Sequence, residues 1–137
     1  MRKARISVIM LFLVALFTVT TANATALLNP QSSIQPRYVG VNRAASDLTI
    51  NSSGCANIYT FLSVMPNYTA SVTSTLYSDS GNYIKSWSRS GGGNIDFQGS
   101  HYVASGHDYY VTLSATIYDR NGKAVDTVIK DSTVVSY

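Results

Sequence analysis

Residues 109–118 alternate between two kinds of side chain over ten positions, and no other feature constrains the fold as strongly. One set is Tyr109, Val111, Leu113, Ala115 and Ile117, and the other is Tyr110, Thr112, Ser114, Thr116 and Tyr118. A period of two is the side-chain period of a β-strand, whose successive residues face opposite sides of a sheet. The pattern therefore predicts a strand with the first set turned inward and the second turned outward.

Other short runs rich in β-branched and aromatic residues follow one another from Arg37, with turn residues between them. They predict strands near 37–42, 46–51, 55–64, 70–78, 83–89, 94–102, 108–118 and 124–135. The chain contains no glutamate, so common helix formers are scarce. Seven or eight strands at this spacing predict one all-β domain over residues 37–137, an antiparallel sandwich or barrel.

Two hairpins can be aligned from the sequence. In the first, a two-residue turn at Ser80-Gly81 places Ser74 opposite Trp87. One face then carries Val72, Ser74, Leu76, Tyr83, Lys85 and Trp87, taken as the core side, and the other carries Ser71, Thr73, Thr75, Tyr77, Ile84, Ser86 and Ser88.

The second hairpin turns near Asn121-Gly122, which suggests a two-residue type I′ turn. We prefer a three-residue loop, 120–122, with a left-handed Gly122. It pairs Ile117 with Val125, Ala115 with Thr127 and Leu113 with Ile129, and so gathers the apolar residues on one face.

Residues 1–26 have the organisation of a secretory signal peptide. Three basic residues lie within the first five positions, an apolar run follows at 6–17, and small residues offer cleavage after Ala24 or Ala26. The apolar run is shorter than the roughly 20 residues of a spanning helix, so an uncleaved anchor is the lesser alternative. Residues 27–36, with two prolines, are predicted to be a flexible leader.

Charge and cysteine content narrow the function classes. Without the signal segment, seven Lys/Arg balance seven Asp, so the basic pI argues for neither nucleic acid nor an anionic membrane. No later segment is apolar enough to span a membrane. Cys55 is the only cysteine, which rules out an internal disulfide. A disulfide-linked dimer through Cys55 is the lesser alternative to a buried thiol on a strand.

No residue pattern predicts catalysis, a metal or a cofactor. His101 and His107 are the only histidines, and a metal site needs three or four converging ligands. The segment around Cys55 supplies no electropositive setting for a reactive thiolate. We therefore expect no catalytic, metal-binding or cofactor-binding residues.

Ten tyrosines are the most distinctive part of the composition. Tyr77, Tyr110 and Tyr118 are predicted to point outward among Ser and Thr residues. Tyrosine offers a large contact area with few rotatable bonds, so such a face suits an extracellular protein or a glycan. We predict these three residues as a possible binding surface.

Val72–Leu76, Trp87 and Gly106-His107-Asp108-Tyr109-Tyr110-Val111 carry a resemblance. Over roughly residues 41–131 the chain resembles a loosely defined group of small exported proteins of Gram-positive, clostridia-like bacteria. The resemblance implies an immunoglobulin-like or fibronectin-III-like β-sandwich and implies no catalytic residue.

The sequence thus predicts a secreted, non-enzymatic β-sandwich protein, an extracellular binding or surface-associated module. The alternative is a small secreted antagonist, either bacteriocin-like or an enzyme inhibitor.

Overall fold

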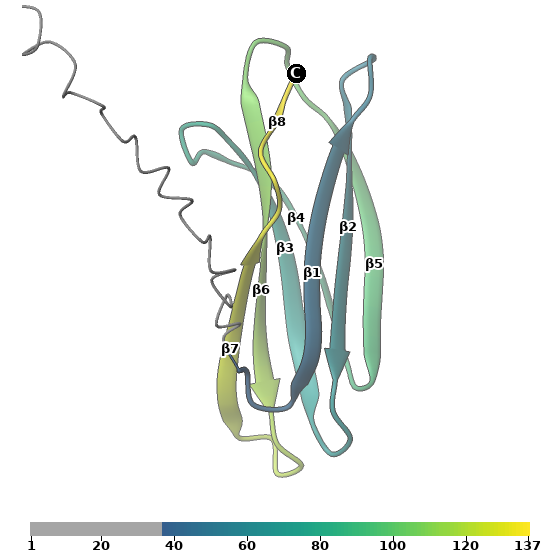
Figure 1. The fold of residues 1–137 in the computed structure, drawn as a ribbon, viewed down its shortest axis with the longest axis vertical. Helices are drawn as coiled ribbons and strands as arrows, with labels where there is room; N and C mark the ends of the chain where they lie inside the picture. Colours follow the sequence, from purple (N-terminus) through teal and green to yellow (C-terminus); the bar gives the residue numbers. More distant parts are fainter. Residues whose placement is uncertain (1–36) are drawn as a thin grey trace, which may run out of the picture. The chain divides into compact units, whose positions relative to one another are not determined.

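The computed structural model describes residues 37–137, which form two antiparallel sheets (Figure 1). The predicted signal peptide, 1–26, and the predicted leader, 27–36, lie outside the described residues. The strands are β1 (Val41–Ile50), β2 (Cys55–Val64), β3 (Thr69–Ser78), β4 (Tyr83–Gly91), β5 (Asn94–Tyr102), β6 (Asp108–Tyr118), β7 (Ala124–Asp131) and β8 (Val135–Ser136). Residues 37–137 contain no helix of the length and hydropathy needed to cross a membrane.

The two sheets confirm the predicted all-β sandwich. One sheet has three strands in the order β1-β2-β5, and the other has the order β4-β3-β6-β7, with β8 also pairing with β6. The chain passes between the sheets at three connections, β2–β3, β4–β5 and β5–β6, as Figure 1 shows. Strands that follow one another in the sequence therefore often lie in different sheets. The two central strands of the larger sheet are β3 and β6, which are not consecutive in the chain.

The core lies between the sheets and follows the predicted alternation. The predicted inward residues of β6 are buried, namely Tyr109, Val111, Leu113, Ala115 and Ile117. From the facing sheet, β2 contributes Ile58 and Leu62, which are also buried. Two polar residues lie in the same interior: the hydroxyls of Thr60 on β2 and Ser74 on β3 share a hydrogen bond across the sandwich.

Tyr109 fixes one end of the sandwich. The residue is 3% exposed, and its hydroxyl donates a hydrogen bond of 2.6 Å to the carbonyl of Ala104, five residues earlier in the β5–β6 connection. The phenol thus satisfies a loop carbonyl while its ring fills the core.

Two predicted strand boundaries are wrong. The strands expected at 37–42 and 46–51 are one strand, β1, because it pairs continuously with β2 from Val64 to Ala56, with an irregularity between Val41 and Arg43. The strand expected at 124–135 ends at Asp131. There the N–H of Ser132 bonds to the Val111 carbonyl and the Ser132 hydroxyl accepts the Val111 N–H, and β8 follows separately.

The β3–β4 hairpin confirms the pairing of Ser74 with Trp87 but not the predicted turn. The loop has three residues, 79–81, with Gly81 at φ 72°, and the Ser78 N–H donates to the Asn82 carbonyl. A bulge next to Leu76 then restores the predicted register beyond it. As a result Tyr83 faces outward opposite Tyr77, and Ile84 packs on the core, the reverse of the prediction for both.

The β6–β7 hairpin has the predicted three-residue loop, with Gly122 at φ 76° and the Asp119 N–H bonded to the Lys123 carbonyl. The predicted pairing beyond it is wrong, because a bulge between Ile117 and Tyr118 shifts β7 by one residue. Val128 therefore pairs with Ala115 and is fully buried, whereas Val125 and Ile129 are 37% and 60% exposed.

Candidate functional site

Two of the three predicted tyrosines lie together on the outer face of the five-stranded sheet. Tyr77 on β3 and Tyr110 on β6 are direct cross-strand partners. Their rings stack with centroids 5.4 Å apart and planes 21° apart, and both side chains are half-buried. Stacking of this kind stabilises the pair and holds the two hydroxyls at fixed positions.

Tyr118 is on the same face but at the opposite end of β6, where it pairs with Thr69. Eight residues of strand separate it from Tyr110, a distance of about 27 Å. The structure therefore does not bring all three predicted residues into one cluster.

Tyr83 joins the stacked pair, although the predicted register placed it on the core side. It is the partner of Tyr77 on β4, is 63% exposed, and its hydroxyl lies 3.2 Å from the Ser86 hydroxyl. One row across the sheet therefore carries Tyr83, Tyr77 and Tyr110.

Between this row and Tyr118 lies a surface made only of hydroxyl side chains. It comprises three cross-strand rows: Ser86, Thr75 and Thr112; Ser88, Thr73 and Ser114; Ser90, Ser71 and Thr116. We call these nine residues the hydroxyl face. In the sequence, each of these three strands has Ser or Thr at every second position. Only the strand order β4-β3-β6 places these residues side by side.

The nine residues of the hydroxyl face carry no charge, and two of their hydrogen bonds are formed within the protein. The hydroxyls of Thr73 and Ser88 lie 2.8 Å apart, and Thr112 donates to the Asp131 carboxylate at 2.7 Å on the flanking strand. Each hydroxyl both donates and accepts, so the face offers an uncharged array of both functions to a partner.

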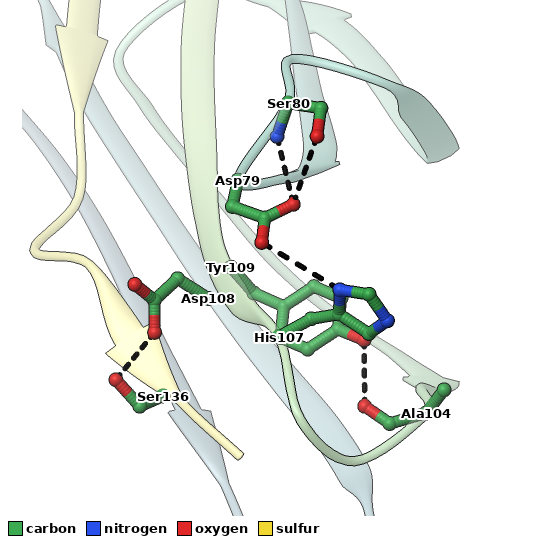
Figure 2. Close-up of polar contacts among 7 residues, drawn as sticks. All are labelled: Asp79, Ser80, Ala104, His107, Asp108, Tyr109 and Ser136. Carbon is green, nitrogen blue, oxygen red and sulfur yellow. Dashed lines mark hydrogen bonds and ion pairs between the residues drawn. The ribbon is translucent and has the colours of Figure 1, made fainter.

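A second polar group lies at the end of the sandwich near Tyr109, and Figure 2 shows its contacts. His107 Nδ1 lies 3.5 Å from Asp79 Oδ2, which links the β5–β6 connection to the β3–β4 turn. Asp108 accepts a hydrogen bond of 2.5 Å from the Ser136 hydroxyl on β8. These contacts join three segments that meet at one end of the fold.

The pKa of Asp79 is set by this turn. Desolvation raises it, but hydrogen bonds from the Ser80 N–H and hydroxyl, together with His107, outweigh that effect and hold the pKa below its ordinary value. Both side chains of the ion pair are about half exposed, 52% for His107 and 43% for Asp79. The pair therefore contributes little to the stability of the fold.

Replacing Ser80 with alanine should raise the pKa of Asp79 toward its ordinary value, because the hydroxyl donor is lost while the N–H remains. A lowered folded-state pKa stabilises the fold above the ordinary Asp pKa, and this contribution disappears as the pH falls through the folded value. Carbon NMR titration of the Asp79 carboxyl measures the shift, with Ser100→Ala as a control. An unchanged pKa in both Ser80→Ala and His107→Gln would contradict this assignment.

His101 and His107 do not converge. His101 lies on β5 opposite Ala56, whereas His107 pairs with Asp79. Cys55 is a free thiol, half-buried rather than fully buried, at the start of β2. Within residues 37–137 no three His, Cys, Asp or Glu side chains are grouped so that they could hold a metal ion.

Comparison with models of protein families finds no match for this chain, and comparison with curated proteins finds none either.

Proposed function

We propose that the protein is a secreted, non-enzymatic binding module that contacts an extracellular protein or glycan through the hydroxyl face and its border of tyrosines. The observation that carries the proposal is the array itself: nine Ser and Thr residues fill three consecutive rows of three adjacent strands. A solvent-facing sheet needs polar residues, but it does not need nine adjacent hydroxyls without a charge among them. The three rows end on β7 with Asp131, Ile129 and Thr127.

Rigid aromatic residues at one end support the same proposal. Tyr77 and Tyr110 are held by stacking, so little side-chain entropy is lost when a partner covers them. Tyr83 adds an exposed ring to the same row. Preorganised tyrosines beside small hydroxyl residues are a composition that recognition surfaces use.

We further propose that the sandwich is immunoglobulin-like or, more closely, fibronectin-III-like. A three-stranded sheet facing a larger one supports this, and so does the bond from Tyr109 to the Ala104 carbonyl, which resembles the tyrosine corner of such domains. Domains of this kind commonly present their sheets and loops to extracellular partners.

Ser114→Lys should weaken binding to isolated cell-envelope material, because it puts a charge in the middle row of the hydroxyl face, where a partner would desolvate it. We expect affinity to fall at least about tenfold in a sedimentation assay with the purified protein. Asn121→Lys, with the same charge on the β6–β7 loop, is the matched control.

Equal binding by Ser114→Lys and the unchanged protein would show that the hydroxyl face is not the binding surface. Hydrolase activity that is lost on substitution of Cys55, His101 or His107 would overturn the non-enzymatic role. Growth inhibition of neighbouring strains without envelope binding would favour the antagonist.

A further inference from the structure

The outer face of the three-stranded sheet differs chemically from the hydroxyl face. Its central strand, β2, buries every second residue and presents the others outward, namely Cys55, Asn57, Tyr59, Phe61 and Ser63. Because the five-stranded sheet packs on the opposite side, no strand of residues 37–137 covers this face. Tyr59 is 40% exposed at its centre.

The aromatic residues form a lane that is one strand wide. Tyr59 and Phe61 are neighbours on β2, and polar side chains from both edge strands flank Tyr59: Asp47 on β1 and Gln98 on β5. We call Tyr59 and Phe61 the aromatic lane. Tyr59 is thus bordered by groups that donate and accept hydrogen bonds, whereas Phe61 lies between Ala45 on β1 and Asp96 on β5.

Polar and aromatic groups also mark the two ends of the lane. At one end the Arg43 guanidinium lies over the Phe61 ring, 5.8 Å from its centroid, which leaves Tyr59 as the more accessible ring. At the other end, beyond Asn57, the next outward residue of β2 is Cys55. It pairs with Tyr102 on β5, which is 71% exposed. From Phe61 to the row of Tyr102 the lane and its flanks run about 20 Å along the strand.

We propose that the aromatic lane binds a neutral linear polysaccharide. The electron-rich face of Tyr59 matches the C–H bonds on the apolar face of a sugar ring. Asp47 and Gln98 flank Tyr59 on either side and would offer hydrogen bonds to the hydroxyls of a sugar ring stacked on it, the carboxylate accepting and the amide both donating and accepting. This proposal goes beyond the proposed function, because it assigns a ligand to the other sheet.

Size and charge favour a glycan over a protein. Three strands about 4.8 Å apart and about 30 Å long offer roughly 400 Å², about half of what each partner buries in a specific protein interface. Asp47, Asp96 and Arg43 lie on this face, and Arg89 of β4 donates to the Asp96 carbonyl at its β5 edge. The lane itself carries no charge, and the two cations are matched by two carboxylates, so the face offers no excess positive charge to acidic glycans or nucleic acids.

The test uses three neutral probes, cellohexaose, xylohexaose and mannohexaose, and one acidic probe, hexagalacturonate. Amide NMR spectra of the purified protein should shift along β2 and β5 with at least one neutral probe, and calorimetry should give its affinity. Tyr59→Ala should weaken that affinity at least about tenfold, whereas Tyr59→Phe, which keeps the ring, should retain it. Tyr110→Ala, a tyrosine substitution on the other sheet, is the matched control.

The proposal is overturned if no neutral probe binds, if hexagalacturonate binds equally well, or if Tyr59→Ala binds like the unchanged protein. It is also overturned if Tyr110→Ala loses the same affinity, since the site would then lie on the hydroxyl face. Ser114→Lys separates the two proposals: it should weaken envelope binding and keep the hexasaccharide.

Discussion

Gly99→Ala should destabilise the protein by about 1–3 kcal/mol, the usual cost of overpacking a well-packed interior. A Cβ at position 99 would lie 2.4 Å from Cε2 of Trp87 and 2.6 Å from its Nε1. The indole of β4 therefore occupies the volume that any side chain on this part of β5 would need. Either the two strands move apart or the indole leaves the edge of the core.

Trp87 is the only tryptophan in the chain, so its fluorescence reports this contact directly. Urea unfolding should show a lower midpoint for Gly99→Ala, and red-shifted folded-state emission would show that the ring has moved toward water. Gly91→Ala is the matched control, because a Cβ there meets nothing closer than Ile95 Cγ1 at 4.0 Å. If Gly99→Ala costs as much in a Trp87→Leu background, the indole is not the cause.

Thr60→Val and Ser74→Ala should each lower the free energy of unfolding by about 1–3 kcal/mol, because each leaves its partner hydroxyl buried and unpaired. Both side chains are fully buried, and their hydrogen bond joins β2 of one sheet to β3 of the other. Valine keeps the shape of threonine at position 60, so that variant isolates the loss of the hydroxyl.

The double variant gives the sharper measurement. Removing both hydroxyls leaves no unpaired polar group, so its cost should be smaller than the sum of the single costs, and a double-mutant cycle from urea unfolding gives the coupling. Additive single costs would mean that each hydroxyl has another partner. Thr73→Val, at the exposed hydroxyl pair of Thr73 and Ser88 on the five-stranded sheet, should leave the free energy of unfolding nearly unchanged.

The sequence was enough to predict most of the strands, the inward residues of β6 and the sandwich class. Burial of one face forces a period of two, and in β6 the residues from Tyr109 to Ile117 keep that period without a break. The alternation also led to Tyr77 and Tyr110 as outward residues. Their stacking depends on the pairing of β3 with β6, two strands that are far apart in the sequence.

The bulges could not be predicted, because each adds one residue at little local cost and reverses which residues face the core. In β7, Val125 and Ile129 share one phase of the alternation while Val128 has the other, so the local pattern favoured the wrong face. Tertiary contacts decide in favour of Val128: it enters the core cluster with Leu113, and the Asp126 carboxylate accepts the Val39 N–H at 2.6 Å. The surroundings of the aromatic lane were missed because only the strand order β1-β2-β5 places Asp47 and Gln98 beside Tyr59.

The pairing of β3 with β6 also governs how fast the molecule can assemble. Its partners, from Thr69 with Tyr118 to Ser78 with Tyr109, lie roughly 30 to 50 residues apart in the chain, with two strands between them. The chain between β3 and β6 must lose entropy to close this loop before the contacts between the two strands can form. We therefore expect the domain to fold in milliseconds to seconds, as other β-folds with mostly non-local contacts do. Until this pairing and the equally distant pairing of β2 with β5 have formed, the local hairpins keep their inner faces open to water.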